Sequence, residues 1–78
     1  MEIIVQEGKT VQFNPELHNK LVQVNGETTR GQHLNGMFFV RTTQKEDAIQ
    51  LVDANTEWEV LLDDLLFQQD KLHMQIVQ

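Results

Sequence analysis

Short runs of alternating apolar and polar residues recur along the chain and indicate β-strands. Residues 2–6 are rich in β-branched side chains, and residues 9–13 alternate polar and apolar positions. Both features favour strands, and the Glu7-Gly8 pair between the two runs is typical of a turn. We therefore predict a β-hairpin at the start of the chain.

The next residues have the features of a helix start. Residues 14–16, Asn-Pro-Glu, combine a capping side chain, a proline suited to the first helical position and a negative charge suited to a helix N-terminus. Leu17, Leu21 and Val24 then follow at the spacing of one helical face. We favour a helix that ends at Val24, and a turn followed by a strand over residues 20–24 is the alternative.

Residues 25–36 lack an apolar pattern and are predicted to form a loop. They contain three of the four glycines, two Thr and two Asn. A loop of this length in a small chain is either a functional or mobile segment or a simple connector. The sequence leaves both interpretations open.

Two further segments are predicted as strands, and a third region is ambiguous. Residues 37–43 hold a compact apolar run, and residues 72–77 alternate apolar and polar side chains. Between them, residues 44–70 satisfy both the strand and the helix period. In the strand interpretation, residues 48–54 and 57–62 are strands joined by a tight turn.

The alternation in the second of these strands assigns each side chain to a face. Trp58, Val60 and Leu62 would share the buried face, while Glu57 and Glu59 would point to water. Trp58, together with Phe67 further along the chain, is therefore expected in the core rather than on a contact surface.

The helix interpretation of residues 44–70 depends on two capping boxes. Thr43 with Glu46, and Thr56 with Glu59, each place Glu three residues after Thr. The apolar residues also fit one helical face, namely Trp58, Leu61, Leu62 and Leu65.

Residues 49–65, IQLVDANTEWEVLLDDL, resemble the second half of a Tudor-type SH3-like barrel. In that family a hydrophobic strand runs into an Asp-Tyr-Gly-Asn turn, followed by Glu, an apolar strand and a one-turn helix that ends in Leu. The resemblance covers under a quarter of the chain and uses common residue types. The corresponding positions are Ile49, Leu51, Asp53, Asn55, Glu57, Val60 and Leu65.

The resemblance implies a small barrel but not the ligand of the family. Tudor-type readers enclose methylated Lys or Arg in a cage of aromatic faces. Here Ala54 stands in place of the Tyr-Gly of the turn, and the chain contains no Tyr. A barrel would need five strands, including one at 20–24 where we favour a helix. The other candidates are residues 37–43, 48–54, 57–62 and 72–77.

The composition bounds the fold. The chain has 78 residues, 40% of them hydrophobic, and no Cys. It is long enough for a single domain, residues 1–78, with a small core and no disulfide. We predict a mostly β (or α+β) domain, either a small SH3-like barrel or an open antiparallel sheet with one short helix.

The negative charge is concentrated in one third of the chain. The net charge is −6, and the segment from residue 46 to residue 70 has eight acidic residues with no Lys or Arg. Such a field disfavours nucleic acid and favours a basic partner, although a solvated face is the simpler interpretation. The residues that we expect to contact a partner are Asp53, Glu57, Glu59, Asp63 and Asp64.

No motif in the sequence predicts catalysis, a cofactor or a metal site. His18, His33 and His73 are scattered, whereas zinc sites need three or four ligands, usually closely spaced. Neighbouring carboxylates such as Asp63 and Asp64 are more typical of a solvated face or a cap than of an acid–base pair. A nucleophile elbow and a phosphate-binding loop are both lacking.

These observations predict a non-enzymatic protein-binding module that uses an acidic face. One alternative is an acidic inhibitor or nucleic-acid mimic that occupies a DNA- or RNA-binding protein, with Glu57 and Glu59 about 7 Å apart on one strand face. Another is a small nucleic-acid-binding barrel that uses Arg30, Arg41 and the Phe38-Phe39 pair.

The sequence also supports expectations about location and assembly. It has no apolar run of the roughly 18 residues that a membrane helix needs, and its first residues are too acidic for a signal peptide. We therefore expect a cytoplasmic protein without a membrane contact. Strand edges and a small core both gain from association, so a homo-oligomer is compatible with the pattern.

Overall fold

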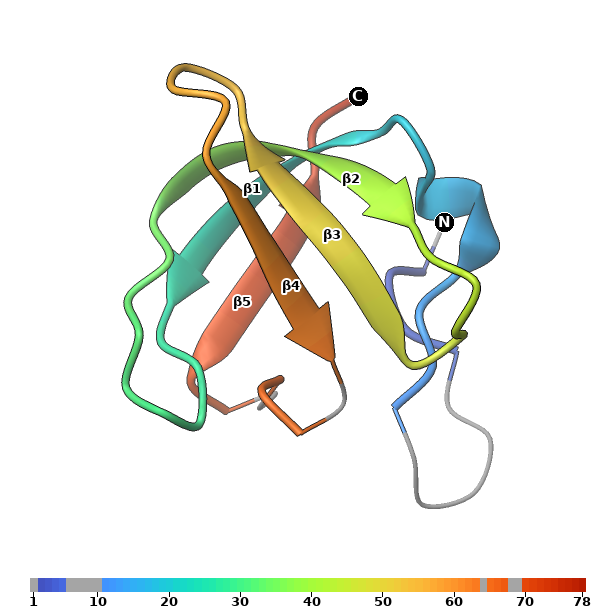
Figure 1. Ribbon diagram of the computed structural model, residues 1–78, viewed down its shortest axis with the longest axis horizontal. Helices are drawn as coiled ribbons and strands as arrows, with labels where there is room; N and C mark the ends of the chain where they lie inside the picture. The colour runs from blue at the N-terminus through green and yellow to red at the C-terminus, as the bar shows by residue number, and fades with distance from the viewer. Residues whose placement is uncertain (1, 6–10, 64, 68–69) are drawn as a thin grey trace.

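Five antiparallel strands form one sheet in the order β4-β3-β2-β1-β5 (Figure 1). The computed structural model describes residues 2–5, 11–63, 65–67 and 70–78. The elements are η1 (Pro15–Leu17), a single 3-10 turn, and the strands β1 (Leu21–Gly26), β2 (Gly36–Thr42), β3 (Ala48–Asp53), β4 (Glu59–Asp63) and β5 (Leu72–Ile76). The prediction of a mostly β fold with an open antiparallel sheet is confirmed.

One face of the sheet is buried because apolar residues occupy every second position of the strands. In β1 and β2, the side chains of Val22, Val24, Phe38 and Val40 are buried while their neighbours are not. Figure 1 shows the sheet curling, so that β1 and β5 pass behind β3 and β4. Within the described residues, β4 and β5 do not pair with each other and remain the edges of the sheet. The core contains side chains from all five strands, from the residues around η1, from the β1–β2 loop and from the segment between β4 and β5: Phe13, Leu17, Val22, Val24, Leu34, Phe38, Val40, Ile49, Leu51, Leu62, Phe67 and Leu72.

The favoured helix up to Val24 is wrong beyond its first turn. Asn14 does cap, since its side chain accepts a hydrogen bond from the Glu16 backbone N–H at 3.0 Å. The turn then ends, and Asn19 adopts a left-handed backbone with φ 66°. The next residues form β1 between β2 and β5, as the alternative interpretation has it. Pairing on both sides of β1 outweighs the helical spacing of its apolar residues.

The helix interpretation of residues 44–70 is also wrong, and the strand interpretation is confirmed. Strands β3 and β4 pair in antiparallel register, with Leu51 opposite Val60. The two threonines of the supposed capping boxes hold turns instead. Thr43 Oγ1 accepts from the Lys45 N–H at 3.1 Å, and Thr56 Oγ1 accepts from the Trp58 N–H at 3.3 Å. Such local hydroxyl-to-backbone bonds compete with helix formation.

The predicted N-terminal pairing is seen in the residues that the structure describes. Ile4 bridges Phe13 in antiparallel fashion, and the Val5 N–H donates to the Gln12 carbonyl at 2.8 Å. The Glu7-Gly8 turn itself lies outside the described residues. Phe13 is tied to the β2–β3 loop, because its N–H donates to the Glu46 carbonyl at 2.8 Å.

The connection between β1 and β2 is an ordered loop with buried residues of its own. Thr28 and Leu34 are both buried, and Glu27 pairs with His33 in an isolated antiparallel β-bridge. Thr29 binds the segment after β4, since its Oγ1 donates to the Leu65 carbonyl at 2.7 Å. The loop therefore closes one end of the core, which is a structural role.

Candidate acidic binding site

The β3–β4 turn is shaped by the Asp53 carboxylate. Asp53 Oδ1 accepts the backbone N–H groups of Asn55 at 2.7 Å and Thr56 at 3.0 Å. These bonds, that of Thr56 first and that of Asn55 second, stabilise the charged form and lower the pKa of Asp53 below its ordinary value of 3.8. The chain then passes through Glu57, which has a left-handed backbone with φ 62°. This turn sets where the neighbouring carboxylates lie.

Beside the turn, the outer face of the sheet is hollowed. Phe39, Val52 and Glu59 form one cross-strand row over β2, β3 and β4. The hollow has a volume of about 360 Å³ and combines an apolar floor with three carboxylates and one guanidinium. We call it the acidic hollow; it is lined by Phe39, Arg41, Val52, Asp53, Ala54, Glu57 and Glu59.

Glu59 is the carboxylate of the acidic hollow that contacts side chains of the two neighbouring strands. Its Oε2 accepts a hydrogen bond from Gln50 Nε2 at 3.0 Å. Its Oε1 lies 3.8 Å from the Arg41 Nη1, and both side chains are at least half exposed. The carboxylate is thus oriented from β3 and β2 while remaining open to solvent.

The structure brings together three of the five expected contact residues. Asp53, Glu57 and Glu59 all line the acidic hollow. Asp63 lies at the opposite end of β4, where its Oδ1 accepts the N–H groups of Leu65 at 3.1 Å and Leu66 at 2.9 Å. Asp64 lies outside the described residues, so its position relative to the others is not described.

The prediction that Glu57 and Glu59 share one face of a strand needs correction. Strand β4 begins at Glu59, and Glu57 belongs to the turn before it. The two carboxylates are brought to the same hollow by the turn rather than by the alternation of a strand.

Two aromatic residues are predicted in the core, and only one lies there. Phe67 is buried and packs edge-on against Phe13, with 5.7 Å between the ring centroids. Trp58 is 46% exposed, because it precedes β4 at the turn. The exposure of Phe39 could have been inferred from its alternation with the buried Phe38, but only if the strand had been placed in register.

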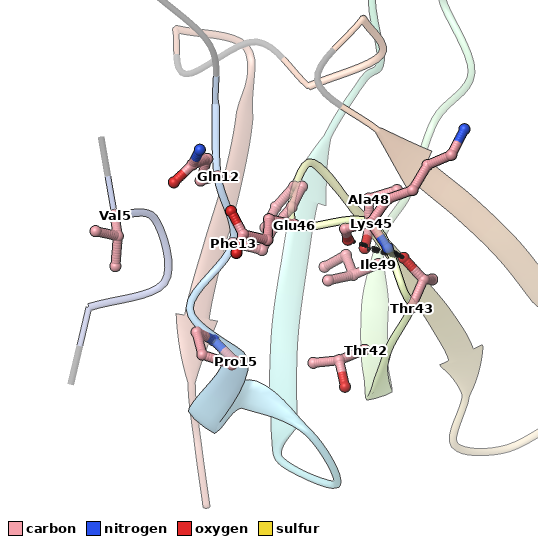
Figure 2. A pocket seen from close by; sticks show the side chains of 10 residues that line it. All are labelled: Val5, Gln12, Phe13, Pro15, Thr42, Thr43, Lys45, Glu46, Ala48 and Ile49. Atoms are coloured by element: carbon pink, nitrogen blue, oxygen red, sulfur yellow. Dashed lines mark hydrogen bonds between the residues drawn. The ribbon is translucent and has the colours of Figure 1, made fainter. Parts of the chain in front are cut away.

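A second cavity lies at the other end of the sheet. It has a volume of about 290 Å³, and Figure 2 shows Val5, Phe13 and Pro15 on one side of it and Thr42 and Ile49 on the other. One polar group near it, the Thr43 hydroxyl, is used locally. Thr43 Oγ1 lies within hydrogen-bonding distance of the Lys45 and Ala48 carbonyls, at 2.9 and 2.8 Å. The cavity is lined by both apolar and polar side chains: Val5, Phe13, Pro15, Ala48 and Ile49 with Gln12, Thr42, Thr43, Lys45 and Glu46.

The described residues contain neither a metal-binding cluster nor a membrane-spanning helix. No three His, Asp or Glu side chains gather there as metal ligands. Nor is any helix in that part of the chain long and apolar enough to cross a membrane.

Comparison with known proteins adds no relationship: no family model, no curated protein and no solved structure matches the chain.

Proposed function

We propose that this protein is a non-enzymatic binding module whose acidic hollow takes a basic segment of a protein partner. The observation that carries the proposal is the convergence of Asp53, Glu57 and Glu59 on one hollow with the exposed ring of Phe39. Carboxylates attract Lys or Arg, and the aromatic face attracts the same cations while packing against their alkyl stems.

The chemistry of the acidic hollow suits recognition by several weak contacts. Exposed ion pairs contribute only about 0.2–1 kcal/mol each, so a partner must offer more than one basic residue. The net charge of −6 raises the association rate with a basic partner, and salt screens that attraction. Binding is therefore expected to be of modest affinity and strongly salt-dependent.

Particular placements argue against the two nucleic-acid functions. Phe38 is buried in the core, so the Phe38-Phe39 pair does not offer two rings for stacking on bases. Arg41 faces Glu59 rather than forming a basic patch. For a mimic, Asp63 lies at the far end of β4 from the acidic hollow, so the described carboxylates do not form one evenly spaced row.

The test is binding of a fluorescently labelled hexalysine peptide, measured by anisotropy at low and physiological salt. Glu57→Lys combined with Glu59→Lys is expected to weaken binding at least tenfold, because two attractive charges become repulsive. Glu46→Lys combined with Asp47→Lys is the control, since it makes the same change in charge in the β2–β3 loop at the opposite end of the sheet. Equal losses in both proteins would reduce the effect to net charge, and no binding by the native chain would refute the proposal.

A competition experiment separates a peptide module from a mimic. Duplex DNA added to the complex with a basic DNA-binding protein displaces a mimic, whereas a module for basic peptides is displaced by hexalysine.

A further inference from the structure

Strand β4 presents an unpaired edge whose backbone orientation can be assigned. Asp53 and Trp58 lie opposite each other where β3 ends and β4 is about to begin. They form a hydrogen-bonded pair, because the Asp53 N–H donates to the Trp58 carbonyl at 2.7 Å. Hydrogen-bonded and non-hydrogen-bonded pairs alternate along an antiparallel ladder. In the observed register, the residues of β4 at non-hydrogen-bonded positions are Glu59, Leu61 and Asp63. Their backbone groups therefore point away from β3, toward the open edge.

Most of these edge groups have no partner among the described residues. Among the described residues, no backbone hydrogen bond on this side is seen for the N–H and C=O groups of Glu59 and Leu61. The Asp63 carbonyl is already used, because it accepts from the N–H groups of Leu66 and Phe67 at 3.2 and 3.0 Å. An edge of this kind is a template for one more strand.

The same three residues direct their side chains to the outer face of the sheet. Leu61 is 51% exposed, Glu59 is exposed and Asp63 is partly so, while Leu62 between them is buried. A strand paired with β4 would place its own side chains beside these. Its residues opposite Glu59 and Asp63 would meet a carboxylate, and the residue opposite Leu61 would meet an apolar side chain.

The other edge of the sheet lacks this arrangement. On β5, the bond from the Val77 N–H to the Leu21 carbonyl at 2.8 Å sets the alternation. The edge-facing residues there are Leu72, Met74 and Ile76, whose side chains belong to the core or pack against it. In a strand added to β5, the residues opposite Leu72, Met74 and Ile76 would therefore meet apolar side chains and no charged group.

We propose that β4 binds an extended segment of the partner as an added strand, with the pattern basic-x-apolar-x-basic. This rests on the proposed function and names its mode of recognition, an antiparallel strand that continues the antiparallel pairing of the sheet. A second copy of this chain does not fit. Arg41 and Lys45 are its only two basic residues four positions apart, and Thr43 lies midway between them.

Charge complementarity supports the pattern at both of its ends. Gln50 of β3 and Arg41 of β2 hold the Glu59 carboxylate over the outer face of the sheet, where it remains half exposed and open to a cation from solvent. Asp63 uses Oδ1 for the N–H groups of Leu65 and Leu66, and its second oxygen has no described partner. The basic residue opposite Glu59 also lies next to the acidic hollow, which Glu59 lines.

The test uses acetylated and amidated heptapeptides of the sequence Thr-Lys-Thr-Val-Thr-Lys-Thr. In the added strand the N–H of the central valine bonds to Leu61, whereas the N–H of the threonine before it points away from β4. N-methylation of the valine is therefore expected to weaken binding about tenfold or more, and N-methylation of that threonine much less. An isomer in which the valine and that threonine are exchanged keeps both lysines in place and is expected to bind several times more weakly.

On the protein side, Leu61→Lys is expected to abolish binding of the patterned peptide. Leu65→Lys adds the same charge at a 73% exposed leucine outside the strand and is the matched control. Circular dichroism verifies that both variants are folded. Amide hydrogen exchange read by NMR should show that the peptide protects the Leu61 N–H of the native protein.

The outcomes distinguish this inference from the proposed function. If hexalysine and all heptapeptides bind equally, and neither N-methylation matters, the acidic face binds cations but β4 adds no strand, and the inference fails alone. If the native chain binds none of these peptides, both proposals fail. Preference for the patterned peptide, with loss only on N-methylation of its valine, supports both.

Discussion

Arg41 and Glu59 face each other across the outer face of the sheet, with 3.8 Å between Nη1 and Oε1. They come from β2 and β4, and Gln50 of β3 lies between them and also binds Glu59. The acidic hollow thus contains a cation of its own, which competes with any cation that a partner brings.

The first prediction is that Arg41→Gln strengthens binding of hexalysine about two- to fivefold at low salt. Removing the guanidinium releases one side of Glu59 and removes a like charge from the acidic hollow, and exposed pairs of this kind contribute about 0.2–1 kcal/mol. Anisotropy titration gives the affinity, and Arg30→Gln, the same charge change in the β1–β2 loop, controls for net charge. Weaker binding by Arg41→Gln would mean that Arg41 instead holds Glu59 in its productive position.

The second prediction concerns Gly26, at the end of β1. Its φ is +128°, a region open mainly to glycine, and a Cβ there would collide with the Lys71 carbonyl oxygen. Gly26→Ala is expected to destabilise the fold by roughly 2 kcal/mol or more, which lowers the Tm by about 10 °C or more in a domain of this size. Thermal unfolding followed by circular dichroism measures it. Gly31→Ala is the control, because a Cβ at Gly31 meets nothing within 4 Å although φ is also positive; equal shifts would show that the collision is irrelevant.

The strands were predictable from the sequence where one face of the strand is buried and the other is exposed to solvent. The predicted strands at 37–43 and 72–77 agree with β2 and β5 to within one residue at each end, the first from its compact apolar run and the second from its alternation. The segment at 20–24 was not predictable in this way, since Leu17, Leu21 and Val24 satisfy a helical period and only the pairing of β1 with β2 and β5 decides the matter.

The acidic hollow was predictable only in part. Charge clustering identified Asp53, Glu57 and Glu59, but their convergence depends on the turn geometry that Asp53 imposes. Phe39 and Arg41 come from a strand outside the acidic segment, so only the register of β2 against β3 brings them in. Likewise, β4 can be identified as an edge strand only when the order of the strands is known, and no local sequence pattern gives that order.

The third prediction follows from the lowered pKa of Asp53. A carboxyl whose pKa is lower in the folded than in the unfolded protein adds stability above the unfolded value, near 4, and loses it as the pH falls through the folded value. Asp53→Asn keeps an acceptor oxygen for the turn but removes this dependence. Urea unfolding from pH 7 to pH 2.5 should show a stability difference between the native protein and Asp53→Asn that shrinks below pH 4. A difference that is constant with pH would mean that charge at Asp53 does not stabilise the turn.

The fourth prediction uses Trp58, the only tryptophan, which is 46% exposed beside the acidic hollow. Its position next to Glu59, the carboxylate opposite one end of the proposed added strand, makes it a native reporter of binding.

In the folded protein the fluorescence emission of Trp58 is expected to be red-shifted and readily quenched by acrylamide, in contrast to a core tryptophan. The patterned heptapeptide should reduce acrylamide quenching, because an added strand on β4 covers the start of that strand, whereas the peptide N-methylated at its central valine should leave quenching unchanged at the same concentration. Blue-shifted emission without ligand would place Trp58 in the core, as its alternation with Val60 and Leu62 predicts, and would contradict the exposed turn from which the acidic hollow is built.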